Sequence, residues 1–433
     1  MRTNDLEHRR GALFYFGTLA EECSMNSSNL SINNYIKPYN TIAIGDNLSY
    51  LRYLSTNFVT FDVVYIDPPY NTGKNFSYND KRSSGEWISF MKKRLELTKQ
   101  ILKDDGVIFI SIDDSSLCEL KMVCDDIFGK DNFIGIFITK QAVRSNSKHI
   151  NTIHEYVVSY ARNKKHLGKF QIKRADSPNE APMIEYISKR VRKEFMTSGK
   201  KAAEKLLAKL NSNYMAKKDI TWLRNYSQVD DKGDIFFPKD LSVPGTPADL
   251  FIDEIDLRLP ALETRKWSSK KKIIRLHEEN KLYFKGDRPY EMHYLKDACD
   301  NVLSILDFYS RQGTNDLKKL GLYNLFDTPK PVELIKYLIR IATYEKDNAL
   351  ILDYFAGSGT TGQAVMEINT EDKKNHIFHL VQLDEKVARG TAQYKFAISN
   401  NITPSVDQLM IHRLNTVKYR LGYSSDFNVE RIH

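Results

Sequence analysis

Short apolar runs alternate with helical patterns in two separate regions of the chain, and this alternation limits the folds open to it. In the first region the apolar runs lie at 41–45, 61–66, 107–112 and 156–160, and the helical patterns at 47–54, 86–102 and 117–128. The run FDVVYI at 61–66 has the composition of a parallel strand buried on both faces. Such alternation predicts an α/β fold with a parallel sheet covered by helices on both sides.

The pattern weakens after residue 163 and returns near residue 330. The second region reads as a helix at 332–342, a strand at 349–355, a helix at 363–368, a strand at 376–383 and a helix from 386. Neither region alone has enough strands for a doubly wound sheet. We therefore expect the two regions to complete one sheet, with the residues between them forming an insert.

The insert carries the excess positive charge. The 433 residues have a formal net charge of +9, and residues 164–330 hold 33 basic and 24 acidic side chains, whereas the rest of the chain balances at 31 and 31. A local excess of this kind indicates an anionic partner, with nucleic acid ahead of membrane lipid or acidic protein. The lysine-rich stretches 189–218 and 265–275 are interleaved with aromatic residues, although solvated helix faces would look similar.

Cysteine use and hydropathy suggest a compartment. Cys23, Cys118, Cys124 and Cys299 are too few and too scattered for a disulfide framework or a zinc knuckle, so we expect reduced thiols. No apolar run reaches the roughly 18 residues that a membrane span needs. The sequence thus predicts a cytoplasmic protein without a membrane partner.

The strongest chemical motif is Asp67-Pro68-Pro69-Tyr70, directly after the apolar run 61–66. Ligands of parallel α/β sheets bind beyond the carboxyl ends of the strands. The two prolines stiffen the loop, so the Asp67 carboxylate and the Pro68 carbonyl can both accept from one NH₂ group, with the Tyr70 ring beside them. This arrangement suits the exocyclic amine of a flipped-out base. The plainer interpretation is a rigid turn that ends a strand.

A second motif, DYFAGSGTT at 353–361, also lies between a strand and a helix. Its glycines allow a ligand to approach the backbone, and the helix N-terminus presents free amides. It lacks the GK[ST] of a phosphate loop and the full G-x-G-x-x-G pattern. An acidic residue before a short glycine turn better suits an amino-acid-like cofactor such as S-adenosylmethionine, although a turn without a ligand is the alternative.

These residues carry a family resemblance. The chain resembles β-class DNA amino-methyltransferases, above all the modification (Mod) subunits of type III restriction-modification systems. The matching blocks are GDNLSYL (45–51), YIDPPYNTGKNFSYND (65–80), residues 87–121, FGKDNFIG (128–135), IHEYVVSYARN (153–163), FDTPKPVELI (326–335) and LDYFAGSGTTGQAVMEIN (352–369). With DPPY before FAGSGTT, the order is similar to the circularly permuted arrangement of this family.

The resemblance implies a role for each matching residue. Asp67, Pro68, Pro69 and Tyr70 would bind the target amino group, and DPPY rather than SPPY favours adenine N6. The residues implied around S-adenosylmethionine are Asp46, Thr328, Lys330, Pro331, Asp353, Phe355, Gly357, Ser358, Gly359 and Thr360. Lys330 is expected to meet the cofactor carboxylate. Where many family members place an acid for the ribose hydroxyls, this chain offers Gln382 or Asp384.

The HEYVVSY block at 154–160 implies a second ring that stacks on the target base. Tyr156 and Tyr160 both qualify, because strand residues four apart face the same side, and for each a core position is the alternative. His154 is expected to be a structural hydrogen-bonding residue. Asp113 and Asp114 look like a metal pair, but the resemblance implies no metal, so we interpret them as a polar cap at a strand end.

Together these features predict a Rossmann-like doubly wound methyltransferase sheet, circularly permuted, with an inserted α+β target-recognition domain. The expected divisions are an extension (1–40), the first catalytic half with DPPY (41–163), the basic insert (164–325), the second catalytic half with the cofactor site (326–400) and a C-terminal helical tail (401–433).

The predicted function is transfer of a methyl group from S-adenosylmethionine to the N6 amino group of a flipped-out adenine in duplex DNA. The resemblance implies a homodimer and leaves open a restriction (helicase-nuclease) subunit as partner. Three alternatives remain: an RNA adenine methyltransferase, a protein-glutamine methyltransferase and a recognition subunit that only binds DNA.

Overall fold

The computed structural model describes residues 39–72, 82–141, 149–176, 180–217 and 220–432. Most of the predicted extension 1–40 and the part of the DPPY block after Thr72 lie outside these residues. None of the helices described in these ranges is both long and apolar enough to cross a membrane.

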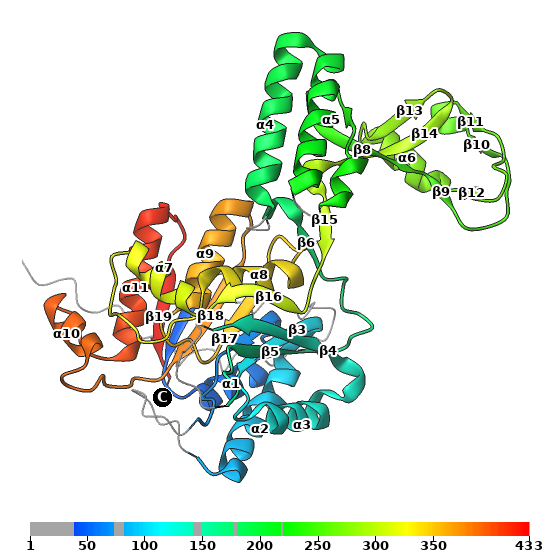
Figure 1. The fold of residues 1–433 in the computed structure, drawn as a ribbon. Coiled ribbons are helices and arrows are strands. Elements are labelled where there is room, and N and C mark those ends of the chain that lie inside the picture. The colour runs from blue at the N-terminus through cyan, green and yellow to red at the C-terminus, as the bar shows by residue number, and fades with distance from the viewer. Residues whose placement is uncertain (1–38, 73–81, 142–148, 177–179, 218–219, 433) are drawn as a thin grey trace, which may run out of the picture.

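One sheet of nine strands dominates the fold, in the order β16, β4, β5, β3, β2, β17, β18, β1 and β19 (Figure 1). The strands are β1 (Asn40–Ile44), β2 (Phe61–Ile66), β3 (Leu102–Ile112), β4 (Phe133–Lys140), β5 (His154–Ala161), β16 (Ile305–Tyr309), β17 (Leu350–Asp353), β18 (Ile377–Gln382) and β19 (Phe427–Arg431). Strands of the second region lie between strands of the first, since β17 pairs with β2 and β18 with β1, in parallel. The two regions therefore complete one sheet, as the alternation predicted.

One strand departs from the predicted parallel arrangement. β5 is antiparallel to both β3 and β4, whereas the other neighbouring pairs of the sheet are parallel. Because β5 runs backwards, Tyr156 pairs with Ile112 at the carboxyl end of β3, and Tyr160 pairs with Ile108 deeper in the sheet. Strand direction thus separates two tyrosines that periodicity could not distinguish.

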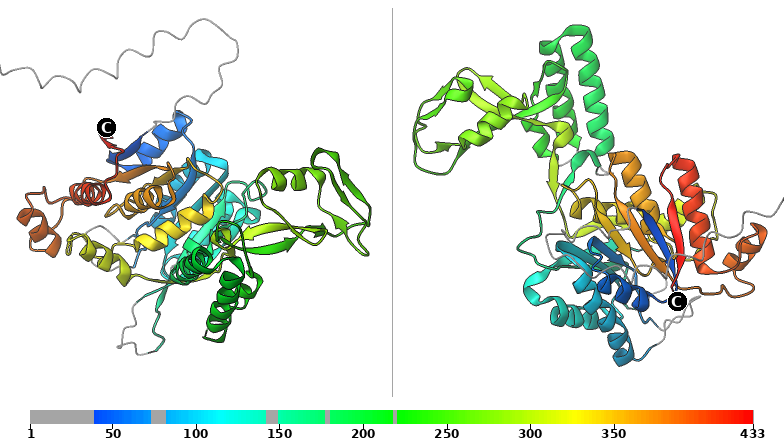
Figure 2. Two further views of the ribbon diagram at one scale, coloured as in Figure 1. Left: turned by 90° about the horizontal axis from the view of Figure 1, so that it is seen from above. Right: turned by 180° about the vertical axis from the view of Figure 1, so that it is seen from behind.

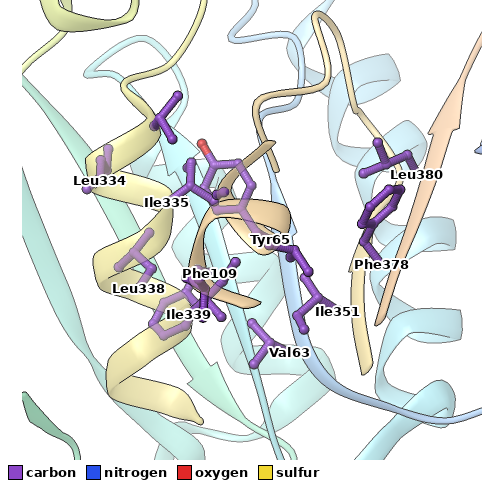
Figure 3. Close-up of a cluster of buried hydrophobic side chains, with 14 of the residues drawn as sticks. Val63, Tyr65, Phe109, Leu334, Ile335, Leu338, Ile339, Ile351, Phe378 and Leu380 are labelled. Atoms are coloured by element: carbon purple, nitrogen blue, oxygen red, sulfur yellow. The ribbon is translucent and has the colours of Figure 1, made fainter. Parts of the chain in front are cut away.

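Helices cover both faces of the sheet (Figures 1 and 2). One layer consists of α1 (Asn47–Thr56), α2 (Ser84–Ile101) and α3 (Leu117–Phe128), and the other of α8 (Val332–Ala342), α9 (Thr360–Asp372) and α11 (Val406–Leu421). Successive residues of β2 face opposite layers: Val63 and Tyr65 lie in the core with α8, and Val64 and Ile66 in the core with the other layer. Figure 3 shows the first of these cores, with the apolar side of α8 over the strands.

The basic insert forms two small cores away from the sheet (Figure 1). The helices α4 (Ala181–Ser198) and α5 (Lys200–Lys217) pack side by side over the first core, and α6 (Lys270–Glu278) packs on the second. The short strands are β6 (Gln171–Lys173), β7 (Gln228–Val229), β8 (Ile235–Asp240), β9 (Ser242–Val243), β10 (Leu250–Ile252), β11 (Leu257–Leu259), β12 (Lys266–Trp267), β13 (Leu282–Lys285), β14 (Arg288–Tyr294) and β15 (Cys299–Asn301). The pair β6 and β15 leads in and out of the insert.

Three predictions about the chain's organisation need correction. The insert was expected to end at residue 325, but β16 pairs with β4 as an edge strand of the main sheet, and α7 (Arg311–Lys319) follows it. The tail 401–433 was expected to be helical, yet β19 follows α11 and pairs with β1. The helix predicted from 386 is α10 (Ala392–Ser399), which begins later. In both edge strands at least one face is open, so their sequences lack a continuous apolar run.

Candidate active site

The DPPY loop leaves the carboxyl end of β2 and is held from two sides. The indole Nε1 of Trp87 on α2 donates to the Pro69 carbonyl at 2.7 Å, and the Ser116 hydroxyl donates to the Tyr70 carbonyl at 3.1 Å. The Tyr70 hydroxyl donates to Asp67 Oδ1 at 2.8 Å. With 29% of its side chain exposed, Asp67 remains accessible to a ligand. Burial raises the pKa of Asp67, the nearby Glu155 carboxylate adds to this, and the Lys330 ammonium opposes it.

Lys330 lies beside the DPPY loop. Its Nζ is 3.3 Å from Asp67 Oδ1 and 2.8 Å from Glu155 Oε2, and it donates to the Tyr70 hydroxyl at 2.6 Å. Burial alone would lower the pKa of Lys330, but the two carboxylates outweigh it and hold that pKa well above its usual value. The prediction that Lys330 meets the cofactor carboxylate stays a prediction, and the structure gives this ammonium two protein carboxylates.

The glycine turn connects β17 to α9 and is fixed by hydrogen bonds. Asp353 accepts from the Phe355 amide at 3.0 Å and from the Thr361 hydroxyl at 2.6 Å. Burial raises the pKa of Asp353 to about 7, although both donors act against it. Gly357, with φ +52°, donates its amide to Gln382 Oε1 at 2.8 Å. Gly359 has φ +79°, and a Cβ there would lie 2.8 Å from Met410 Cγ, so this position needs glycine.

A buried arginine on α11 holds the glycine turn through hydrogen bonds. Arg413 on α11 is fully buried and donates to Ser358 Oγ at 2.6 Å, to Thr360 Oγ1 at 2.9 Å and to Gln363 Oε1 at 2.9 Å. Its Nη2 has no partner within the described part of the chain. Burial lowers the pKa of Arg413 to about 10. Ser358 and Thr360 therefore hold the turn in place, and neither is among the residues that line the cavity between the two motifs.

A cavity of about 370 Å³ joins the two motifs. Among the residues predicted from the sequence, seven line it: Asp46, Asp67, Pro69, Thr328, Phe355, Gly357 and Gln382. Lys330, Pro331, Asp353, Ser358, Gly359 and Thr360 are not among its lining residues, and neither are Pro68 and Tyr70, although Pro69 is. The cavity thus runs from the base motif to the glycine turn, along the carboxyl ends of the strands.

At the predicted ribose position the structure distinguishes the two candidates. Gln382 lines the cavity, whereas Asp384 does not. The Asp384 Oδ2 atom lies 3.2 Å from Arg431 Nη1. The acid that the sequence reading missed is Glu385, which lines the cavity and whose pKa is raised by burial. It lies three residues after Gln382, in a segment without regular strand geometry, so periodicity could not have placed it.

The two candidate stacking residues lie in different surroundings. Tyr156 is partly exposed near the carboxyl end of β3, and its hydroxyl donates to Asp114 Oδ1 at 2.8 Å and lies 2.7 Å from His154 Nε2. Tyr160 is fully buried and donates to Asp125 Oδ1 at 2.7 Å. Tyr160 as a base platform is therefore wrong, because no base can reach a ring enclosed in the core.

Several cavity residues were not predicted, and two of them form a connected group. Arg94 on α2 donates to Asn47 Oδ1 at 2.7 Å and lies 3.5 Å from Asp46 Oδ2. Asn47 in turn donates to the Tyr354 carbonyl at 2.7 Å, which joins α1 to the glycine turn. The other unpredicted residues of the lining include Arg82, Phe90 and Phe326. The only sequence signal was that Asn47 directly follows Asp46 in the GDNLSYL block.

Comparison with known proteins places the chain in a family. A family model described as DNA methylase, of the N6/N4 methyltransferase type, matches residues 61–372. The chain belongs to this DNA methylase family. The match spans both motifs and the insert between them, so the resemblance to DNA amino-methyltransferases is confirmed.

Individual relatives include Mod subunits of type III restriction-modification enzymes and a type II methyltransferase. The Mod subunit of the type III enzyme EcoP15I from Escherichia coli is 30% identical over 382 residues, which is 79% of this chain and 58% of the relative. The EcoPI Mod subunit from Escherichia phage P1 is 29% identical over 87% of this chain and 62% of its own length. The type II methyltransferase M.KpnI from Klebsiella pneumoniae is 29% identical over 87% of both chains. The chain thus spans about three fifths of the two Mod relatives.

Proposed function

We propose that this DNA methylase transfers a methyl group from S-adenosylmethionine to the N6 amino group of an adenine in duplex DNA, as part of a restriction-modification system. The observation that carries the proposal is the continuity of the cavity. It begins at Asp67 in the DPPY loop and extends to Gly357 and Gln382 at the glycine turn. A base amine and a cofactor held in these two places would share one space.

The chemistry of the cavity suits S-adenosylmethionine. The apolar side chains Phe355, Val381 and Leu383 offer contact area for an adenine ring, and the Asp46 and Glu385 carboxylates offer acceptors. Lys330 remains the residue proposed for the cofactor's carboxylate, and Arg82 and Arg94 add positive charge to the cavity lining. When bound, the cofactor supplies an electrophilic methyl group on a positively charged sulfur.

The protein's part in the reaction is to hold the amine. The Asp67 carboxylate accepts from the amino group and favours the positive charge that develops on nitrogen, and the Pro68 carbonyl is its proposed second acceptor. Tyr70 lies against Asp67, and Tyr156 is the remaining candidate for a second stacking ring. Positioning of the amine in line with the methyl group accounts for most of the acceleration expected here.

Adenine is proposed over cytosine because the motif is DPPY and not SPPY. The family itself includes both N6 and N4 enzymes, so base identity rests on this resemblance. Asp67, Pro68, Pro69 and Tyr70 are the residues to which the proposal assigns recognition of the amine.

Duplex DNA is proposed as the substrate because of the insert. Lys201, Lys205 and Lys209 lie on one exposed side of α5, and none has an ion-pair partner among the residues described. Tyr186 is also exposed, whereas Tyr226 and Trp267 are buried in the insert's own cores and are unsuited to contact DNA. An RNA methyltransferase, a protein-glutamine methyltransferase and a binding-only subunit remain as outcomes of the test. The predicted partners remain a restriction subunit and a second copy of the chain, and the predicted location remains the cytoplasm.

A methyl-transfer assay tests the proposal. The wild-type protein is incubated with tritiated S-adenosylmethionine in three separate reactions, which contain adenine-unmethylated genomic DNA, total RNA or a protein extract. We expect label in DNA alone, and loss of transfer in Asp67→Ala with cofactor affinity retained in calorimetry. Label in RNA or protein supports a rival reaction, and cofactor binding without transfer to any substrate supports the binding-only alternative.

A further inference from the structure

Side chains from three distant segments meet at the Asp67 carboxylate. Asp67 and Tyr70 belong to the loop after β2, Glu155 to the start of β5, and Lys330 to the segment before α8. The side chains of Lys330 and Glu155 are only 13% and 15% exposed. Because water has little access, charges at these distances act on one another strongly.

The balance of charge in this cluster depends on Glu155. Asp67 and Lys330 alone form a neutral pair, which offers little attraction to a positive charge that develops nearby. Lys330 Nζ lies closer to Glu155 Oε2, at 2.8 Å, than to Asp67 Oδ1, at 3.3 Å. With Glu155 included, the cluster carries one net negative charge, and the Asp67 carboxylate is the member that lines the cavity.

We propose that Glu155 is a positioning residue for methyl transfer, which holds Lys330 as its own counterion and so leaves the negative charge of Asp67 available to the substrate amine. The inference rests on the proposed function. As the amino nitrogen bonds to the methyl carbon, the carbon–sulfur bond breaks and its electron pair stays on sulfur. The nitrogen's surplus proton then passes to the Asp67 carboxylate and on to water. A net negative cluster stabilises the positive nitrogen before that proton leaves.

The arrangement around Glu155 favours its charged form. Burial raises the pKa of Glu155, but the Lys330 charge and the hydrogen bonds from Lys330, Gln141 and Tyr70 outweigh burial and hold that pKa below its usual value. Gln141 follows β4 and donates to Glu155 Oε1, so the second carboxylate oxygen is also occupied. Glu155 is thus fixed in place as an anion.

The two partners of Asp67 shift its pKa in opposite directions. Glu155 raises the pKa of Asp67 and Lys330 lowers it, while Tyr65, Tyr70 and Asp353 are the other titratable groups nearby. Glu155→Gln should therefore lower the pKa of Asp67, and Lys330→Met should raise it. If transfer needs ionised Asp67, the acidic limb of the pH profile of kcat/KM moves down in the first variant and up in the second.

The experiment compares Glu155→Gln, Lys330→Met and the double variant in tritium transfer to adenine-unmethylated genomic DNA. Glu155→Gln should reduce kcat about tenfold or more, because the cluster becomes neutral. The double variant restores one net negative charge and should be several-fold more active than Glu155→Gln alone. Calorimetry should give wild-type affinity for S-adenosylmethionine in Glu155→Gln, so that a fall in its kcat is assigned to the transfer step.

A matched pair elsewhere serves as control. Lys336 on α8 is 3% exposed, and its Nζ lies 2.7 Å from Glu371 Oε1. Neither residue is among those that line the cavity. Lys336→Met and Glu371→Gln should alter stability without moving the acidic limb. If Glu155→Gln does not fold, the upward shift of the limb in Lys330→Met tests the same charge balance.

The outcomes separate the inference from the proposed function. A wild-type protein that transfers no methyl group to DNA overturns both. A wild type that transfers, together with unchanged kcat and an unmoved limb in Glu155→Gln, overturns the inference alone. A double variant whose loss is the product of the two single losses also overturns it, since charge balance requires the two substitutions to compensate.

Discussion

Arg413 offers a test of how the C-terminal helix supports the cofactor turn. The substitution Arg413→Met keeps most of the side-chain volume and removes the guanidinium, with its hydrogen bonds to Ser358, Thr360 and Gln363. We expect a folded protein in which the glycine turn is less firmly held and S-adenosylmethionine binds more weakly.

The expected change in the free energy of unfolding of Arg413→Met is the difference between opposing contributions. The hydrogen bonds from this charged donor to three side-chain oxygens, at about 2 kcal/mol each, suggest a loss of about 6 kcal/mol in the free energy of unfolding. The same substitution removes the unpaired Nη2, which costs about 1–3 kcal/mol, and the further cost of burying a charge. The first two contributions leave a loss of about 3–5 kcal/mol, and relief from burying the charge lowers it further, so the net loss should be about 2–4 kcal/mol. Cofactor affinity should fall about tenfold, which corresponds to about 1.4 kcal/mol.

Urea unfolding and calorimetric titration with S-adenosylmethionine measure the two quantities. Arg340→Met is the matched control, because Arg340 binds Glu371 and Asp372 between α8 and α9 and does not contact the turn. The control should lose stability and retain affinity. A folded Arg413→Met protein with wild-type affinity would refute the role of Arg413 in holding the turn.

Three further predictions follow from the same structure. Burial raises the pKa of Asp353 to about 7, and a cationic ligand favours the ionised form of this carboxyl. The affinity for S-adenosylmethionine should therefore rise between about pH 6 and pH 8, and Asp353→Asn should flatten that rise in calorimetry. An equal slope of affinity against pH in the two proteins would contradict this. Tyr156→Ala should reduce methyl transfer with cofactor affinity unchanged, whereas Tyr160→Phe should lower the melting temperature and keep transfer, and the reverse pattern would contradict their placement. Replacing the three exposed lysines of α5 with glutamine should reduce the slope of log DNA affinity against log salt by about 0.9 per lysine, and an unchanged slope would exclude that face from DNA contact.

The central strands of the main sheet could be predicted from the sequence, whereas the strands at its edges could not. The FDVVYI strand is buried on both faces, so it carries a continuous apolar signal. The ILDFY strand at 305–309 alternates exposed and buried residues, and its one partner among the described strands is β4, more than 160 residues earlier. Its position depends on a distant partner, which a local pattern does not reveal. The direction of β5, and with it the different surroundings of Tyr156 and Tyr160, is hidden for the same reason.

The candidate site divides in a similar way. Asp67 and Gly357 belong to contiguous motifs whose chemistry can be read locally. Glu155, Glu385 and Arg413 reach the site through tertiary packing, and no local spacing links them to it. Glu155 belongs to the HEYVVSY block, but its proposed role depends on Lys330, which is 175 residues away.

Analysis of the reaction product tests the central claim most directly. Adenine-unmethylated genomic DNA is treated with the wild-type protein or with Asp67→Asn and unlabelled S-adenosylmethionine, digested to nucleosides and analysed by mass spectrometry. We predict N6-methyladenine with the wild type and none with Asp67→Asn, which should still bind the cofactor. Appearance of N4-methylcytosine in place of N6-methyladenine, or equal methylation by the two proteins, would contradict the assignment of Asp67 to an adenine amine.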